Sequence, residues 1–182
     1  VTREVGEKLV TRIKWWEEYT ARLKGEMNNN PSPGNKAGGL TTILEKSLGA
    51  VAKGGTTPLV DVYEYAQAVD KHGFVYMDTP GYDPVSATGQ VAGGANLICF
   101  TTGRGSAYGC KPSPSLKLST NNALWERQEE DIDINRGDIV DSGVAIAAKG
   151  RELLTMIRAP ATGQASNSGH GGHGVDERGT RS

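Results

Sequence analysis

Residues suited to binding a small anion follow the apolar stretch that ends at Thr102. The segment TTGRGS (101–106) places an arginine between two glycines, and GCKP (109–112) adds a cysteine and a lysine. An arginine guanidinium makes bidentate hydrogen bonds to a carboxylate. The two segments are therefore predicted to form an anion-binding loop around Arg104. Cys110 is either a soft metal ligand or a small loop residue, the latter favoured because no histidine lies near it.

The segment DTPGYDPVSATG (78–89) carries two carboxylates at the end of another apolar stretch. Asp78 and Asp83 suit metal ligation or acid–base chemistry. Asp83 precedes Pro84 and is better explained as the N-cap of a helix, whereas Asp78 has no local capping role. Asp78 is the favoured functional carboxylate of the two.

The segment NPSPGNKAGG (30–39) is a third anion-binding candidate. Its backbone N–H groups, with Lys36, are able to hold a carboxylate or phosphate near a helix N-terminus, and a plain turn with a solvated lysine explains it equally well. It lacks the Gly-Lys-Ser/Thr ending of a P-loop. The GxGxxxG spacing at 103–109 also departs from a dinucleotide fingerprint, and the prolines that follow prevent a helix there. No nucleotide cofactor is predicted.

Two other features indicate structure rather than chemistry. The acidic run EEDIDIN (129–135) departs from the calcium-loop pattern in its glycine and its twelfth position, and a solvated helix end explains it. Cys99, between Ile98 and Phe100, is predicted to lie in the core.

The elements that must position these residues follow from hydrophobic periodicity and from helix and strand boundaries. Asn28 to Asn35 contains two prolines and is predicted to be a loop. The sequence predicts helices over 3–24, 42–53, 84–93 and 123–130, and one that starts at Asp141 or Ser142 and stops at Pro160. It predicts strands over 59–65, 74–77, 97–102 and 116–118.

Strands that alternate with helices and glycine-rich loops favour an α/β fold with a largely parallel sheet and helices on both faces. Ligands bind such sheets beyond the carboxyl ends of the strands, where the glycine clusters fall. One domain is predicted over residues 1–162. The aperiodic residues 163–182 are predicted to be a disordered tail.

Composition excludes several classes of function. The net charge of −1 gives no basic footprint for nucleic acid, and no apolar run is long enough to span a membrane. The first residues do not form a signal peptide, and two cysteines are too few for a disulfide framework, so a cytoplasmic location is expected. The 25 glycines form clusters without a collagen or linker pattern, which is typical of loops that approach a ligand.

Four strings, NPSPGNKAGGLTTILEKSLGAVAKGG, DTPGYDPVSATGQVAGGANLICFTTGRGS, GCKPSPSLKLSTN and EEDIDIN, follow one another from Asn30 to Asn135. In this order they resemble the C-terminal region of the altronate dehydratase and galactarate dehydratase family. DTPGYDP and GCKP are more similar to the altronate branch, and Arg136 replaces the small residue or cysteine expected after DIN.

The resemblance implies a hydro-lyase that converts a sugar acid to a 2-keto-3-deoxy acid with a divalent metal, Fe²⁺ or alternatively Mn²⁺. It also implies a Rossmann-like sheet with an unusual crossover. Family members are longer and carry an N-terminal β-clip domain and an upstream half with further site motifs. The chain is therefore expected to be a partial domain that is inactive alone, contacts the rest of the enzyme and forms a homo-oligomer.

For this chemistry Arg104, with Lys36 or Lys111, is expected to hold the substrate carboxylate, and one lysine could instead be the base. Asp78 is expected to bind metal or orient water. The predicted catalytic residues are Lys36, Asp78, Arg104 and Lys111; the predicted metal ligands are Asp78, Asp83 and Cys110; the predicted substrate-binding residues are Asn35, Thr79, Thr101, Thr102, Gly103, Gly105 and Ser106. Two alternatives remain: a related sulfolactate sulfo-lyase, and a non-catalytic scaffold or sugar-acid-binding module.

Overall fold

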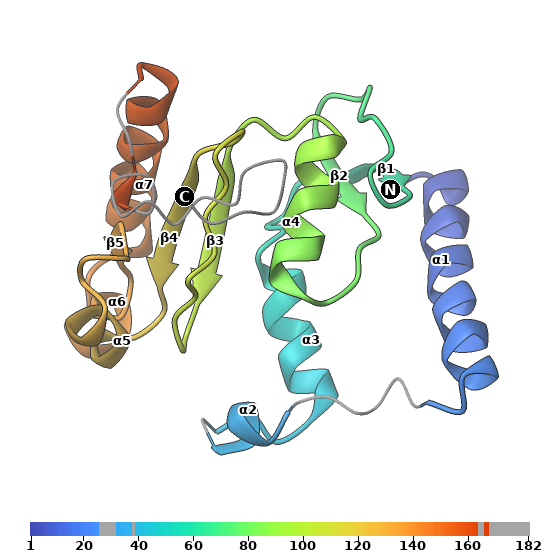
Figure 1. Cartoon of the computed structure of the whole chain (residues 1–182), viewed down its shortest axis with the longest axis horizontal. Helices are drawn as coiled ribbons and strands as arrows, with labels where there is room; N and C mark the ends of the chain where they lie inside the picture. The colour runs from blue at the N-terminus through green and yellow to red at the C-terminus, as the bar shows by residue number, and fades with distance from the viewer. Residues whose placement is uncertain (26–31, 38, 164–165, 168–182) are drawn as a thin grey trace. The chain divides into compact units, whose positions relative to one another are not determined.

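The computed structural model describes residues 1–25, 32–37, 39–163 and 166–167. Contacts divide the chain into two units, Val1–Thr79 and Pro80–Ser182, and each contains a parallel sheet of its own (Figure 1). The mixed α/β class with parallel strands is confirmed. The five described strands form two small sheets rather than one, and the Rossmann-like arrangement with a crossover stays a prediction. A single domain over 1–162 also stays a prediction, and the expected tail lies outside the described residues except for residues 163, 166 and 167.

The first unit begins with a long amphipathic helix that packs on a sheet of two strands. Helix α1 (Arg3–Arg22) starts after Thr2, whose hydroxyl accepts a hydrogen bond from the Val5 N–H at 3.4 Å. It contacts strand β1 (Leu59–Tyr63), which pairs in parallel with β2 (Phe74–Met77). The predictions of a helix over 3–24 and of these two strands are thus confirmed.

Two shorter helices connect α1 to β1. Helix α2 (Pro33–Ala37) overlaps the predicted loop, which is wrong for Pro33 to Asn35 because proline fits the first turn of a helix. Residues 28–31 of that loop lie outside the described residues. Helix α3 (Ile43–Ala52) is capped by Thr42, whose hydroxyl accepts a hydrogen bond from the Glu45 N–H at 3.2 Å, as predicted.

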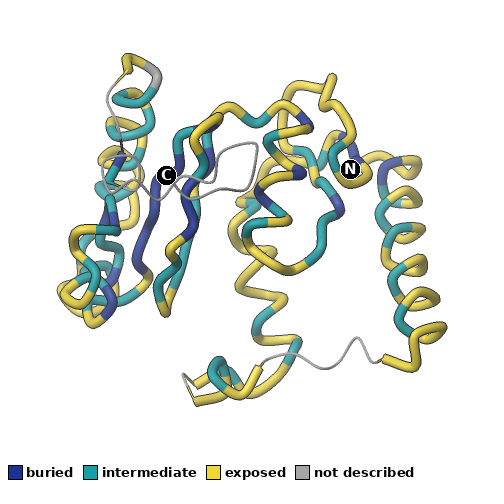
Figure 2. The backbone as a smooth tube through the Cα atoms, in the orientation of Figure 1, coloured by how far each residue is buried: buried dark blue, intermediate teal, exposed yellow. Residues whose placement is uncertain are grey.

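The second unit is built on strands β3 (Ile98–Thr102), β4 (Ser115–Ser119) and β5 (Ile134–Asn135), in the order β3-β4-β5 and all parallel. Its helices are α4 (Asp83–Ala92), α5 (Asn122–Arg127), α6 (Asp138–Asp141) and α7 (Ile146–Ala161). Leu116, Leu118 and Ile134 form a buried cluster that packs against Leu153, Met156 and Ile157 of α7. Strand β4 is buried along its whole length (Figure 2).

Several local predictions in this unit are wrong. Asp83 is the first residue of α4 and does not cap it, because Tyr82 holds the cap position without a side-chain hydrogen bond. Cys99 is exposed rather than in the core. Helix α7 begins after Ala145, and Pro160 lies inside its last turn instead of stopping it. The end of the acidic run forms β5, since Ile134 supplies a buried strand residue.

None of the described helices is both long enough and apolar enough to cross a membrane.

Candidate active site

The carboxyl ends of β3, β4 and β5 meet at one edge of the second sheet because the three strands are parallel. Polar residues end or follow each strand there. We call this group the carboxyl-edge cluster, and it comprises Thr101, Thr102, Gly103, Arg104, Gly105, Ser106, Thr120, Asn121, Asn122, Asn135 and Arg136.

The turn after β3 is fixed by the Thr102 side chain. Its hydroxyl oxygen accepts hydrogen bonds from the N–H groups of Arg104 at 3.3 Å and Gly105 at 3.0 Å. The Thr102 carbonyl accepts from the Thr120 N–H at 3.0 Å, which joins this turn to the end of β4. Thr102 therefore shapes the loop that carries Arg104.

Helix α5 holds the same loop from the side of β4. Asn121 caps α5 through a 2.8 Å hydrogen bond from the Leu124 N–H, and its amide nitrogen donates to the Gly103 carbonyl at 3.0 Å. Gly105 has φ +98° and lies against Gln128, so that an added Cβ would come within 3.0 Å of the Gln128 amide. Only glycine fits this backbone position.

Asn135 ties the end of β5 to β4 and α5. Its side-chain oxygen accepts hydrogen bonds from the Ser119 hydroxyl at 3.1 Å and the Gly137 N–H at 2.9 Å, and its nitrogen donates to the Asn122 side chain at 2.8 Å. An added Cβ at Gly137 would collide with the backbone of Asn121 and Asn122. The ends of all three strands are thus held in one hydrogen-bonded network.

Two arginines belong to this cluster, and the Asp141 carboxylate accepts a hydrogen bond from Asn122 beside them at 2.7 Å. The Arg104 guanidinium makes no hydrogen bond or ion pair with a described residue, although the Arg104 carbonyl accepts from Arg127 at 2.9 Å. The buried Nε of Arg136 likewise has no hydrogen-bond partner among the described residues. Guanidinium groups with unused donors at the carboxyl edge of a parallel sheet are suited to a carboxylate ligand.

The structure groups only part of the predicted site. Residues 101–106 lie together at the carboxyl edge of β3. Cys110 is half-buried beside the Tyr108 hydroxyl, and burial together with this neighbour raises the pKa of Tyr108. Lys111 is exposed on the same loop. Asp83 is the first residue of α4 in the second unit, whereas Asn35, Lys36, Asp78 and Thr79 belong to the first, and their part in a shared site stays a prediction.

Asp78 is buried directly after β2, and its carboxylate accepts hydrogen bonds from two side chains of α1. One oxygen accepts a 2.6 Å hydrogen bond from the Trp16 indole, and the other accepts from Arg12 at 2.8 Å. Each oxygen therefore already accepts a hydrogen bond, and the residue is only 4% exposed, so the carboxylate is less accessible to a metal. Arg12 and Trp16 are four residues apart, so the sequence predicts that they share one face of the helix. It does not predict that both bind Asp78.

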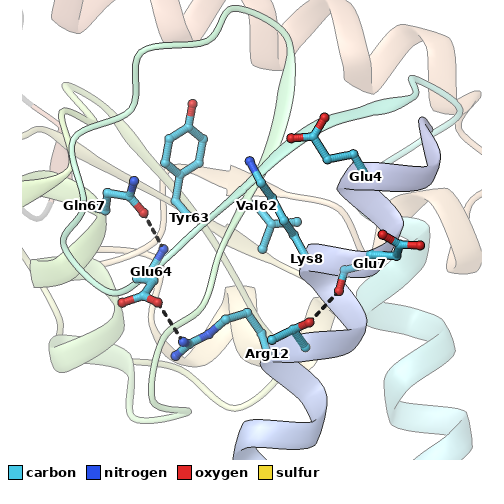
Figure 3. Close-up of a pocket in the computed structure, with 9 residues that line it drawn as sticks. Glu4, Glu7, Lys8, Arg12, Val62, Tyr63, Glu64 and Gln67 are labelled. Atoms are coloured by element: carbon cyan, nitrogen blue, oxygen red, sulfur yellow. Dashed lines mark hydrogen bonds and ion pairs between the residues drawn. The ribbon is translucent and has the colours of Figure 1, made fainter.

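A cleft of about 620 Å³ lies between α1 and β1 in the first unit (Figure 3). Lys8 and Asp61 pair in this region at 2.8 Å, and Arg12 pairs with Glu64 at 3.0 Å. The hydrogen bond to Asp61 raises the pKa of Lys8, and the bond from Lys8 lowers the pKa of Asp61. Because the Lys8 and Arg12 cations are already paired with carboxylates, we expect the cleft to bind an anion less well than the carboxyl-edge cluster.

The predicted metal ligands do not form a site within the described residues. Asp78 belongs to the first unit, whereas Asp83 and Cys110 belong to the second. No group of three or more histidine, cysteine, aspartate or glutamate side chains able to hold a metal occurs in the part of the chain that the structure describes. The residues described here do not by themselves fit a divalent metal.

Sequence reasoning missed Lys117. Its side chain lies in the middle of β4, has no exposed surface, and has no hydrogen-bond partner for Nζ among the described residues. Burial lowers the pKa of this lysine. The available signal was the alternation SLKLS, which places a lysine between two leucines on an inner strand.

Comparison with known proteins identifies the family. The model described as "D-galactarate/Altronate dehydratase, C-terminal" matches residues 1–177. The chain belongs to this family. The match covers both units and therefore the carboxyl-edge cluster as well as Asp78.

Individual relatives agree with the family match. Galactarate dehydratase (L-threo-forming) of Escherichia coli is 39% identical over 90% of this chain and 31% of its own length. Altronate dehydratase of Bacillus subtilis is 35% identical over 90% of this chain and 33% of its own length. The (2R)-sulfolactate sulfo-lyase subunit beta of Chromohalobacter salexigens is 32% identical over 80% of this chain and 38% of its own length.

The chain spans about a third of the length of the dehydratases that it matches. The identities to galactarate and altronate dehydratases lie between 35% and 39% and do not separate the two branches. The expected closeness to the altronate branch therefore stays a prediction.

Proposed function

We propose that this chain forms the C-terminal part of a hydro-lyase that dehydrates a sugar acid of the galactarate or altronate type to a 2-keto-3-deoxy acid. The observation that carries the proposal is the match to the dehydratase family over residues 1–177. The carboxyl-edge cluster supports it, because two arginines with donors that no described residue accepts lie at the edge where an α/β sheet binds its ligand.

In this proposal Arg104 binds the substrate carboxylate. Removal of the proton beside a carboxylate builds negative charge on the carboxylate oxygens, and a nearby guanidinium stabilises that charge. The hydroxyl of Thr101 is available to a substrate hydroxyl, since no hydrogen bond of that side chain to a described residue exists. Thr102 and Asn121 act indirectly, by holding the loop that carries Arg104.

A divalent metal, Fe²⁺ or Mn²⁺, remains part of the proposal, with ligands drawn mainly from the rest of the polypeptide. The described residues alone offer no ligand set. The remaining part of the same enzyme and a second copy of it are the proposed protein partners. No nucleotide is assigned a role.

The first experiment compares this chain with the complete natural polypeptide that carries these residues. Each is incubated with galactarate, altronate and sulfolactate, with Fe²⁺ or Mn²⁺, and 2-keto acid or sulfite is measured. We expect the complete polypeptide to dehydrate one of the two sugar acids and the chain alone to be inactive. Release of sulfite instead would favour sulfo-lyase activity, and binding without turnover would favour a sugar-acid-binding module.

A further inference from the structure

Lys117 lies on a polar face of β4. Leu116 and Leu118 point to the face of the sheet that α7 covers, so Ser115, Lys117 and Ser119 point to the opposite face. Lys117 has 0% of its surface exposed, although an inner strand of a parallel sheet normally carries apolar residues on both faces. A fully buried lysine at this position calls for an explanation.

The loop that carries Arg104 crosses the same face. Phe100 of β3 pairs in register with Lys117 and so shares its side of the sheet. The Tyr108 ring lies 6.3 Å from the Phe100 ring, and its hydroxyl lies beside Ser115. Tyr108 belongs to the connection between β3 and β4, residues 103–114, which begins at the carboxyl-edge cluster. Lys117 is thus on the face that this connection covers.

The Lys117 amine has no hydrogen-bond acceptor among the described residues. The charged groups that face it are Asp131 and Asp133, both on the segment that leads into β5. The Asp133 oxygens accept from the backbone N–H of Lys117 at 2.7 Å and of Asn167 at 2.9 Å rather than from Nζ. Burial lowers the pKa of Lys117 more than the two carboxylates raise it, which favours the uncharged amine.

We propose that Lys117 is a catalytic base of the dehydration, whose amine accepts the proton that the sugar acid loses from the carbon beside its carboxylate. This inference rests on the proposed function. The C–H bond breaks, its electron pair enters the enediolate, and a new N–H bond forms. The ammonium then returns a proton to the departing hydroxide as the C–O bond breaks. One water leaves, and the lysine is again uncharged.

Because Lys117 has no exposed surface, the proposal requires the 103–114 connection to shift before substrate reaches the amine. This connection contains no helix or strand, and Gly103 and Gly105 lie at the end that bears Arg104. Binding of the substrate carboxylate by Arg104 and exposure of Lys117 would therefore involve the same loop. A lysine is suited to the role because its pKa shifts readily when it is buried.

The test replaces Lys117 in the complete natural polypeptide. Lys117→Met keeps the length of the side chain and removes the amine, whereas Lys117→Arg keeps a cation that cannot act as a base at neutral pH. We expect each to lower kcat by about 10²- to 10⁴-fold, with KM within about threefold of the wild-type value. Thermal stability of Lys117→Met should equal or exceed that of the wild type. Lys14→Met, a change on the exposed surface of α1, is the matched control and should leave kcat unchanged.

Near-normal kcat in either variant would overturn the proposal while leaving the dehydratase function intact. A large rise in KM at unchanged kcat would also overturn it, because it would make Lys117 a carboxylate-binding group. If the wild type dehydrates no sugar acid, the proposed function and this inference fail together. In an active enzyme, ¹⁵N NMR titration of the Lys117 amine gives a second readout. A midpoint below the ordinary lysine value of about 10.4 is expected, and a midpoint at or above it would overturn the role as a base.

Discussion

The sequence predicts Asp78 as a catalytic or metal-binding carboxylate, whereas the structure shows that it links α1 to the end of β2. The carboxylate is buried, and Trp16 and Arg12 of α1 donate hydrogen bonds to its two oxygens. Each donor comes from a helix more than sixty positions away in the sequence, as the separations of 62 and 66 residues record. The sequence identifies Asp78 as a carboxylate without a local cap role, but it cannot supply these distant partners.

Replacing Asp78 should therefore destabilise the first unit. Asp78→Ala leaves the Arg12 charge and the Trp16 N–H without their acceptor, and we expect a loss of about 3 kcal/mol in the free energy of unfolding. Glu64→Ala is the matched control, because Glu64 also pairs with Arg12 but its side chain is 70% exposed; its loss should be below about 1 kcal/mol. Urea denaturation measures both, and equal losses would contradict the assignment.

Substitution of Arg104 tests whether the carboxyl-edge cluster binds substrate. Arg104→Ala in the complete polypeptide should abolish sugar-acid dehydration while the circular dichroism spectrum and melting temperature stay unchanged, since the guanidinium makes no hydrogen bond or ion pair with a described residue. Arg22→Ala, on the exposed surface of α1, should retain full activity. Near-normal turnover in Arg104→Ala would remove this residue from the site.

The pairing of Lys8 with Asp61 has a pH signature. The pKa of Asp61 is lowered in the folded protein, mainly by Lys8, so its contribution to stability is complete above the unfolded value of about 3.9 and is lost as pH falls through the lower folded value. Acid unfolding followed by tryptophan fluorescence should show a smaller loss of stability below pH 4 in Asp61→Asn than in the wild type. The same loss of stability below pH 4 in both proteins would contradict this pairing.

At the scale of elements, local sequence patterns predict where helices and strands form. They do not predict which strands pair with one another. The periodicity of Val5, Leu9 and Ile13 and the pair Thr42 and Glu45 are visible in the sequence, and α1 and α3 form where these signals place them. Strand β5 was missed because only Ile134 and Asn135 form it and an acidic run precedes them. Its assignment depends on pairing with β4, which is a long-range property.

Part of the candidate site was likewise predictable from the sequence, and part depends on long-range contacts. The segment TTGRGS follows a recognisable strand, and the rule that ligands bind beyond strand ends places it correctly at an edge. Asn121, Asn135 and Gly137 carry no special pattern of their own. They join the cluster only because the turns after β4 and β5 lie beside the turn after β3, and sequence spacing does not encode that contact.

Gly137 gives a direct test of the contact between the ends of β4 and β5. In Gly137→Ala the new Cβ would meet the backbone of Asn121 and Asn122, and we expect a loss of stability of about 1–3 kcal/mol, measured by urea denaturation. Gly150→Ala is the control, because Gly150 lies in α7 with nothing within 4 Å of the added Cβ. That change should stabilise the chain by about 0.5–1 kcal/mol. Similar effects of the two changes would contradict the close approach.

At the scale of the whole molecule, α3 presents an apolar stripe to solvent. Leu44, Leu48 and Val51 are exposed by 72%, 70% and 72%, and their spacing places them on one side of the helix. A stripe of this kind commonly marks an interaction surface. The chain spans about a third of the length of its dehydratase relatives, and we propose that further polypeptide of the kind they contain would cover this stripe.

We accordingly expect the isolated chain to self-associate through this stripe. Leu48→Glu should lower both the average mass in sedimentation experiments and the fluorescence of a bound hydrophobic dye. Ala50→Glu, an exposed position on another side of the same helix, should change neither. A wild-type chain that stays monomeric and dye-free at high concentration would contradict this expectation.

The short strand β5 lies at an edge of the second sheet, and Asn167 contacts the two residues that precede it. Asn167 donates from its side chain to the Ile132 carbonyl at 2.8 Å and from its backbone to the Asp133 carboxylate at 2.9 Å. An uncovered strand edge is a template for pairing with another chain. Loss of Asn167 would leave the Ile132 carbonyl without this donor, beside an edge strand to which a neighbouring molecule could add a strand of its own.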